Sequence, residues 1–142
     1  MGWTDCIYAK INCCNMIGPL PDWLSPLCKR LLCDGYFSRH PDQVIVNEYL
    51  PGQGISAHID CIPCFGKTIA SLSLGSHCVL ELSNEESKHP ILLERCSLLI
   101  LSKDARYYWK HSIPARKTDR HLGVTYPRER RISLTFRSVL LD

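Results

Sequence analysis

The first hydrophobic pattern along the chain has the period of an α-helix. Apolar residues recur three and four positions apart, at Leu24, Leu27, Cys28, Leu31 and Leu32. This spacing places them on one stripe of a helix, a surface that can pack over a sheet. Pro21 and Asp22 suit the first turn, and Asp34-Gly35 suits the end. The sequence therefore predicts one amphipathic helix between Pro21 and Gly35.

From residue 43 onward the pattern changes to short apolar segments separated by turn residues. The segments span residues 43–50, 67–74, 77–82, 91–93, 96–101, 108–113 and 130–140. Pro51-Gly52-Gln53-Gly54 is a strong loop signal between the first two. Many short strands after one helix predict a mainly β (α+β) fold, with a double-sheet jelly roll and one or two flanking N-terminal helices. We expect a single domain over residues 1–142, with its core in 19–142.

Composition narrows the class of protein. With 45% hydrophobic and 22% charged residues, the chain resembles a globular domain rather than a disordered one. No apolar run approaches the roughly 20 residues of a membrane helix, and no signal peptide is recognisable, so no membrane partner is expected. Nine cysteines without an export signal predict reduced thiols in the cytoplasm, or in the nucleus of a eukaryote. Cys78 should fill core volume. A monomer is expected.

Positive charge is concentrated in residues 114–131. The net charge of the whole chain is +3, yet this segment alone holds six cations against two carboxylates. The cations are Arg116, Lys117, Arg120, Arg128, Arg130 and Arg131. Such a segment can attract phosphates, although a solvated surface loop is the simpler explanation.

The first candidate for a catalytic site is His58-Ile59-Asp60 together with His111, which comes later in the chain. Two imidazoles and one carboxylate are the ligand set of a non-haem Fe(II) site that leaves positions open for oxygen and a co-substrate. Residues two apart in a strand share a face, so His58 and Asp60 can reach one metal. Alone, the H-x-D pair is a weak signal, and His111 alone fits a hydrogen-bonded core histidine equally well.

The last and first predicted strands strengthen the metal interpretation. Alternation in the last strand gives one face to Arg131, Ser133, Thr135 and Arg137. Two arginines on such a face are costly to bury unless an anion pairs with them. Asn47 and Tyr49 share a face of the first strand and can donate to carboxylate oxygens. Together these residues predict an oxygenase that uses iron and an acidic co-substrate. The alternative is that both faces are solvent-exposed sheet.

Five segments follow one another in a specific order. They are Asn47-x-Tyr49, Pro51-Gly52-x-Gly54-Ile55-x-x-His58-x-Asp60, Ser71-Leu72-Ser73-Leu74-Gly75, Arg106-Tyr107-x-Trp109-x-His111-x-Ile113 and Arg131-x-Ser133-x-Thr135-Phe136-Arg137. Over about residues 20–140 the set resembles the AlkB family of Fe(II)- and 2-oxoglutarate-dependent dioxygenases, which adopt a double-stranded β-helix. Pro41-Asp42-Gln43 and the loop after Leu50 are most similar to the animal members that hydroxylate a modified wobble uridine in transfer RNA.

The resemblance implies roles for individual residues. His58, Asp60 and His111 would hold the iron. Arg131 would form the salt bridge to the distal carboxylate of 2-oxoglutarate, which is consumed with O2. Further co-substrate contacts match Asn47, Tyr49 and Arg137. Arg106 matches a family position near the active site, but the resemblance gives it no role.

The resemblance also suggests a substrate class. It implies a modified nucleic acid, RNA more than single-stranded DNA, that is demethylated or hydroxylated. Ile62 stands where bacterial repair members carry a second acidic residue, which argues against repair of cationic methylated bases. Residues 1–18 could form a partial substrate lid, formed mainly by residues 3–14. The alternatives are a protein or small-molecule hydroxylase on the same fold, and a binding module without turnover.

Cys61-x-x-Cys64 directly follows the metal pair. This spacing is compatible with a redox pair or with half of a zinc site. Zinc normally needs a second such pair, and Cys13-Cys14 does not have that spacing. Whatever their role, thiols beside an oxidising iron are vulnerable to oxidation.

Overall fold

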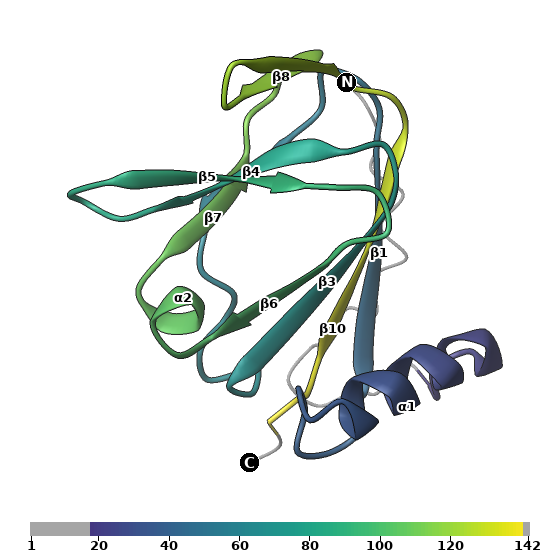
Figure 1. Cartoon of the computed structure of the whole chain (residues 1–142). Coiled ribbons are helices and arrows are strands. Elements are labelled where there is room, and N and C mark those ends of the chain that lie inside the picture. Colours follow the sequence, from purple (N-terminus) through teal and green to yellow (C-terminus); the bar gives the residue numbers. More distant parts are fainter. Residues whose placement is uncertain (1–17, 141–142) are drawn as a thin grey trace.

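A computed structural model describes residues 18–140 of the chain (Figure 1). In chain order the elements are η1 (Asp22–Leu24), α1 (Ser25–Cys33), β1 (Gln43–Tyr49), β2 (Ile55–His58), β3 (Thr68–Gly75), β4 (Cys78–Ser83), β5 (Lys88–Leu93), β6 (Leu98–Ser102), α2 (Lys103–Tyr107), β7 (Lys110–Ile113), β8 (Thr118–His121), β9 (Val124–Pro127) and β10 (Arg131–Arg137).

The strands form two four-stranded antiparallel sheets. One has the order β1-β10-β3-β6 and the other β2-β7-β4-β5, while β8 and β9 make a separate hairpin. Figure 1 shows the two sheets facing each other, with α1 outside the first sheet, the β8–β9 hairpin at one end and α2 at the other. Non-consecutive strands lie side by side in both sheets, as in a jelly roll. The predicted fold class is confirmed.

Helix α1 covers the outer face of the first sheet. Its buried side chains Cys28 and Leu31 pack with Leu134 and Phe136 of β10 in one core cluster. Gly35 ends the helix with φ 79°, a conformation that glycine adopts without strain. Because the apolar half of β10 packs against this helix, its polar half must face the other sheet.

The inner face of β10 is polar, as the sequence pattern predicts. Ser133 is buried and lies opposite Asn47 of β1 on one side and Ser73 of β3 on the other. Arg131, at the start of β10, is also buried, with 3% of its surface exposed. The facing sheet contributes an apolar cluster that includes Cys78, confirming its place in the core. The exposed-sheet alternative is therefore wrong.

Several element boundaries differ from the sequence prediction. β5 begins at Lys88, three residues before the predicted segment, and β10 ends at Arg137 although apolar residues continue to Leu140. Helix α2, strand β2 and the β8–β9 hairpin were not predicted as elements. Each has only four or five residues, too few for a period of two or 3.6 to be recognised.

The β8–β9 hairpin is held to the second sheet by a buried carboxylate. Asp119 of β8 is fully buried and accepts hydrogen bonds from Arg128 (2.7 and 2.9 Å), Arg116 (2.7 Å) and the backbone N–H of Val79 in β4 (3.1 Å). Arg128 also donates to the carbonyl of Gln53, in the loop before β2. The hairpin is thus tied to the loop between β1 and β2.

Replacing Asp119 with asparagine should lower the free energy of unfolding by about 3 kcal/mol at neutral pH, because Arg128 would stay buried beside a neutral partner. Burial alone would raise the pKa of Asp119, but hydrogen bonds from Arg128 and Arg116 outweigh it and lower the pKa. The charged group therefore stabilises the fold above the ordinary carboxyl pKa of about 4. That contribution disappears as pH falls through the lower folded-state pKa. Urea denaturation should show a smaller difference between the two proteins at acidic than at neutral pH.

Glu48→Gln provides the control for this prediction. It breaks the exposed ion pair between Glu48 and Arg130, and pairs of this kind contribute less than about 1 kcal/mol. Equal losses for the two variants would contradict a special role for Asp119.

The structure bears only in part on the predicted lid, membrane contact, oligomeric state and cellular compartment. The partial lid proposed for residues 1–18 lies outside the described residues, apart from Gly18. Within residues 18–140, no helix has both the length and the apolar character needed to cross a bilayer. The monomeric state and the cellular compartment stay predictions.

Candidate metal centre

Three predicted ligands meet between the ends of β2 and β7. His58 is the last residue of β2 and pairs across the ladder with His111 of β7. Asp60 lies two residues beyond the strand. Its Oδ1 is 3.2 Å from His58 Nε2 and 3.6 Å from His111 Nε2, and the two imidazole centroids are 4.3 Å apart. The structure therefore brings all three side chains together.

The reason given for this convergence in the sequence prediction is partly wrong. His58 and Asp60 do not share a face of one strand, because β2 ends at His58. Asp60 belongs to the following loop, and that loop turns its carboxylate back toward the two histidines. The strand ladder fixes the imidazoles, whereas the aspartate is fixed by something else.

The two histidines differ in their protonation. His58 Nδ1 lies 2.8 Å from the carbonyl of Ser56, which can only accept, so Nδ1 carries a proton and Nε2 is the ring atom that faces Asp60. The pKa of His58 is raised, chiefly by its hydrogen bond to Asp60. Burial lowers the pKa of His111 to about 4, so this ring is neutral at physiological pH.

Asp60 is a buried carboxylate surrounded by cationic groups. Burial raises its pKa, but the hydrogen bond from His58 and the charges of Arg137 and His111 outweigh burial, and the pKa is lowered. Arg137 Nε lies 2.9 Å from Asp60 Oδ2. The carboxylate is therefore charged at neutral pH and can bind a cation.

The donor set fits one divalent ion. All three ligand atoms lie within 4.8 Å of one another. Ligand bonds of about 2.1 Å that meet at right angles would place neighbouring donors about 3 Å apart. The observed separations from Asp60 Oδ1 are close to that value, and two imidazoles with one carboxylate suit Fe(II) with open positions for other ligands.

Arg131 supplies a cationic, anion-binding group to this interior. Its guanidinium donates to Ser73 Oγ at 2.9 Å and stacks on the ring of Tyr49, 5.3 Å from the centroid. Its Nε and Nη1 are buried without a hydrogen-bond partner among residues 18–140. Buried charged donors without partners are strongly destabilising. A carboxylate group at this position would accept hydrogen bonds from the guanidinium, so the site also fits 2-oxoglutarate.

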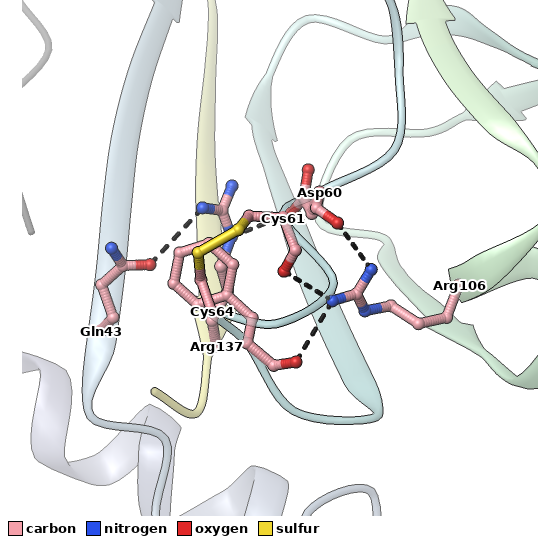
Figure 2. The surroundings of a disulfide bond; sticks show 7 residues. Gln43, Asp60, Cys61, Cys64, Arg106 and Arg137 are labelled. Carbon is pink, nitrogen blue, oxygen red and sulfur yellow. Dashed lines mark hydrogen bonds and ion pairs between the residues drawn. A yellow bond between two sulfur atoms is a disulfide. The ribbon is translucent and has the colours of Figure 1, made fainter. Parts of the chain in front are cut away.

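The other predicted co-substrate residues have different surroundings. Asn47 and Tyr49 lie on β1 opposite Ser133 and Arg131, on the same polar interior face. Arg137 lies at the far end of β10, where it joins the carboxylate of Asp60 and stacks on Phe65, 4.6 Å from the ring centroid (Figure 2). Arg131 and Arg137 thus mark the two ends of the interior polar row. Contacts of Asn47, Tyr49 and Arg137 with 2-oxoglutarate stay predictions.

The expectation of reduced thiols is wrong for one pair. Cys61 and Cys64 form a disulfide in the loop that carries Asp60 (Figure 2). A C-x-x-C pair in one tight turn brings its sulfur atoms within bonding distance without any other part of the fold. Among the described cysteines, Cys28 and Cys78 are free and buried, while Cys33 and Cys96 are free and exposed.

Differential alkylation should reproduce this pattern. In the native, unreduced protein an alkylating reagent should label Cys33 and Cys96 first, because they are exposed. Burial raises the pKa of the Cys28 and Cys78 thiols and protects them. The peptide with Cys61 and Cys64 should accept label only after reduction, measured by mass spectrometry. Labelling of this peptide without reductant would contradict the disulfide.

The sequence prediction named Arg106 as a residue near the active site but gave it no role. Arg106 of α2 is buried, and its guanidinium donates to the carbonyls of Asp60, Cys61, Phe65 and Gly66. Backbone carbonyls exist at every position, so no sequence pattern reveals such a partner. Only its burial inside a short, polar helix marks it.

Known proteins support the interpretation of this site. Residues 8–137 match the model of the 2OG-Fe(II) oxygenase superfamily. The chain is 42% identical over 126 residues to uncharacterized protein L905 of Acanthamoeba polyphaga mimivirus, covering 87% of this chain and 60% of that protein. It is 43% identical over 103 residues to the tRNA (carboxymethyluridine(34)-5-O)-methyltransferase ALKBH8 of Macaca fascicularis, covering 72% of this chain and 16% of the relative. The chain thus spans less than two thirds of these relatives.

A bacterial relative and one solved structure extend the comparison. The dioxygenase AlkB of Salmonella typhimurium is 31% identical over 150 residues, covering 96% of this chain and 67% of the relative. The structure of OsALKBH1 superposes with a TM-score of 0.62 at 21% identity, over 84% of this chain and 66% of that one, which supports the fold. With its matched motifs and its interior His-Asp-His site, the chain belongs to the AlkB family within the 2OG-Fe(II) oxygenase superfamily.

Proposed function

We propose that this chain catalyses Fe(II)- and 2-oxoglutarate-dependent hydroxylation or oxidative demethylation of a modified nucleic acid, RNA more readily than DNA. The observation that carries the co-substrate half of the proposal is Arg131. Its buried Nε and Nη1 have no hydrogen-bond partner among the described residues, in the same interior as His58, Asp60 and His111. Such an active site needs a metal centre and a cationic group that binds the carboxylate of the co-substrate, and this interior contains residues suited to both.

The bound iron would couple oxidative decarboxylation of 2-oxoglutarate to oxidation of a substrate C–H bond, with one oxygen atom of O2 ending in succinate and the other in the product. The protein supplies the surroundings. His58, Asp60 and His111 would hold the ion, and Arg131 would orient the co-substrate. If the oxidised carbon is attached to nitrogen, the resulting hydroxymethyl group leaves as formaldehyde, which amounts to demethylation.

The names of relatives support nucleic acid as substrate. ALKBH8 of Macaca fascicularis is named for a modified uridine of transfer RNA, and ALKBH6 of Danio rerio, 32% identical over 148 residues, is named a probable RNA/DNA demethylase. The chain matches only 16% of that ALKBH8, so its methyltransferase activity is not carried over. The shared oxygenase segment is what favours RNA here.

Most of the cations in residues 114–131 are not available to bind phosphates. Four of the six cations in residues 114–131 are occupied inside the fold or by another side chain. Arg116 and Arg128 bind Asp119, Arg131 is buried, and Arg130 pairs with Glu48. Lys117 and Arg120 are exposed and can still contact phosphates. Salt-dependent binding through this hairpin should therefore be modest, and specificity must come mainly from the metal pocket.

Ile62 favours an uncharged base over a cationic one. It lies two residues after Asp60, with 47% of its surface exposed. An apolar side chain two residues after a metal ligand offers no electrostatic attraction to a methylated base that carries positive charge. A neutral, modified uridine is therefore a better match to Ile62 than a cationic base.

Turnover assays can test the proposal directly. The protein is reconstituted with Fe(II) under anaerobic conditions and then exposed to oxygen and 2-oxoglutarate, and succinate is followed. Three oligonucleotides of equal length are compared: RNA with a modified wobble uridine, the unmodified RNA, and single-stranded DNA with a methylated base. The expected result is succinate formation stimulated most by the modified RNA, with a hydroxylated or demethylated nucleoside found by mass spectrometry.

Other outcomes would point to a different substrate class. Stimulation by peptides but by none of the oligonucleotides would replace nucleic acid with a protein substrate on the same site. Stimulation by a small metabolite alone would indicate a small-molecule hydroxylase. No succinate with any substrate would overturn the enzymatic proposal and leave a jelly-roll binding protein.

A further inference from the structure

Arg106 is the most deeply buried charged side chain near the metal centre. It projects from α2, and 2% of its surface is exposed. All four hydrogen bonds that its guanidinium donates within residues 18–140 end on backbone carbonyls: Nη1 to Asp60 (2.9 Å), Nε to Gly66 (3.1 Å), and Nη2 to Cys61 (3.2 Å) and Phe65 (3.3 Å). Figure 2 shows the guanidinium reaching the loop that carries Asp60 and the disulfide.

Burying this cation is unfavourable in free energy unless its hydrogen bonds replace the lost hydration. Burying a guanidinium removes its hydration, and neutral carbonyls repay this only through well-formed hydrogen bonds. A leucine or methionine at this position of α2 would bury a similar volume without that cost. The four acceptors explain why an arginine occupies this position, because they belong to the two ends of one loop. Asp60 and Cys61 form one end, and Phe65 and Gly66 the other.

Other contacts hold the side chain of Asp60 and the far end of the loop. Arg137 Nε lies 2.9 Å from Asp60 Oδ2, and the amide of Gly66 donates to the carbonyl of Ser138 at 2.8 Å. The backbone of Asp60 is held differently. β2 ends at His58, so no sheet ladder fixes Asp60, whereas His58 and His111 pair within one. The amide of Phe65 donates to the carbonyl of Cys61 at 3.2 Å, and the amide of Leu140 to the carbonyl of Cys64 at 2.9 Å. These bonds shape the middle of the loop. The carbonyl of Asp60 itself is held by Arg106.

We propose that Arg106 is a positioning residue of the metal site: its guanidinium closes the loop from Asp60 to Gly66 and thereby aims the carboxylate of Asp60 at the two histidines. This inference rests on the assignment of His58, Asp60 and His111 as metal ligands. The hydrogen bonds of Arg106 within residues 18–140 end on backbone carbonyls and not on the ligand atoms of His58, Asp60 or His111. Arg106 acts through the backbone of Asp60, as an outer group that orients a ligand.

The disulfide is the competing explanation for the order of this loop. Cys61 and Cys64 are joined inside the segment whose ends Arg106 holds. A covalent link between them constrains the interior of the loop but reaches neither the carbonyl of Asp60 nor that of Gly66. If the guanidinium is the main anchor, the disulfide can be removed with little effect on the metal site.

Metal affinity separates these explanations without relying on activity. Mn(II) serves as an oxygen-stable probe with a preference for nitrogen and oxygen donors, and the free ion is counted by its electron paramagnetic resonance signal. Arg106→Gln removes the charge and most of the donors, while Arg106→Lys keeps the charge but cannot span both ends of the loop. Arg128→Gln is the control, since Arg128 is also buried, with 8% of its surface exposed, and binds Asp119 rather than the loop that carries Asp60.

The expected result is a clear difference between the two arginines. Arg106→Gln should raise the Mn(II) dissociation constant about tenfold or more, and Arg106→Lys by a smaller factor, at a temperature where each variant is folded by circular dichroism. Arg128→Gln should leave the constant within about twofold even if it destabilises the fold more. Amide hydrogen exchange should speed up across residues 61–66 in Arg106→Gln and stay unchanged there in Arg128→Gln.

Three results would overturn the inference. Unchanged Mn(II) affinity in Arg106→Lys, or in Arg106→Gln where it folds, would show that Asp60 keeps its aim without the guanidinium. A loss in the double variant Cys61→Ser/Cys64→Ser as large as in Arg106→Gln would assign the role to loop order in general. A wild-type protein without Mn(II) binding would remove the metal assignment itself, a failure distinct from the first two because it appears before any variant is compared.

Discussion

Replacing Asp60 with alanine should weaken binding of the metal at least about 100-fold and reduce Fe(II)-dependent succinate formation to background. Loss of a group that merely orients a ligand lowers metal affinity about 10- to 100-fold. Loss of a ligand itself should therefore lower metal affinity about 100-fold or more. Asp60 is the single anion of the three-residue set, and its Oδ1 faces both imidazoles. Without it, two neutral rings bind a divalent ion only weakly.

The removal of Asp60 has a second consequence through Arg137. That guanidinium lies 2.9 Å from Asp60 Oδ2 and is otherwise surrounded by the ring of Phe65 and the amide of Gln43. In Asp60→Ala its positive charge would remain near the metal position and repel a cation. Asp60→Asn keeps the shape of the side chain but not its charge, and should bind metal with intermediate affinity.

A carboxylate elsewhere provides the comparison. Asp104, in the first turn of α2, is exposed, and Asp104→Asn removes the same charge. This variant should bind Mn(II) and form succinate like the wild type. Succinate formation by Asp60→Ala at more than a tenth of the wild-type rate would contradict the assignment of Asp60 as a ligand.

The chemistry of the site was more accessible from the sequence than its geometry. Alternation along β10 correctly separated Arg131 and Ser133 from Leu134 and Phe136, because alternation is a local property of any strand. Turn residues located the loop before β2. The jelly roll followed from the number and length of the strands, which does not depend on their exact ends.

Other parts could not be predicted because they depend on contacts between distant segments. Asp119 looked like one acid in a basic surface segment, yet it is buried between two arginines and β4. Arg106 reaches carbonyls 40 to 46 positions earlier in the chain. The C-x-x-C spacing of Cys61 and Cys64 is shared by metal sites, redox pairs and disulfides, so the choice needed the loop conformation.

These cases share a physical reason. A local period depends on neighbouring residues and is visible in the sequence, whereas the partner of a buried charge depends on the whole topology. Places where a charged residue occupies a buried position without a local reason are therefore where function or support for function should be sought. Arg131, Arg106 and Asp119 all meet that description.

Replacing Arg131 with methionine should raise the concentration of 2-oxoglutarate needed for half-maximal succinate formation about 100-fold or more. Truncating one partner of a buried, hydrogen-bonded charge pair typically costs at least 2 to 5 kcal/mol. Arg131→Lys should fall between wild type and methionine, because an ammonium group cannot bind a carboxylate through two parallel hydrogen bonds. Arg130→Met is the matched control, since Arg130 is the preceding residue but is exposed and pairs with Glu48.

The stability of the same variant distinguishes a binding role from a structural one. Without co-substrate, two nitrogen atoms of the Arg131 guanidinium are buried and lack hydrogen-bond partners among the described residues, so this side chain should destabilise the free protein. Arg131→Met should therefore melt at the same temperature as wild type or higher when no ligand is present. Added 2-oxoglutarate with Mn(II) should raise the melting temperature of wild type but not of the variant. A variant that melts lower without ligand, and gains as much from ligand as wild type does, would mean that Arg131 serves the fold rather than the co-substrate.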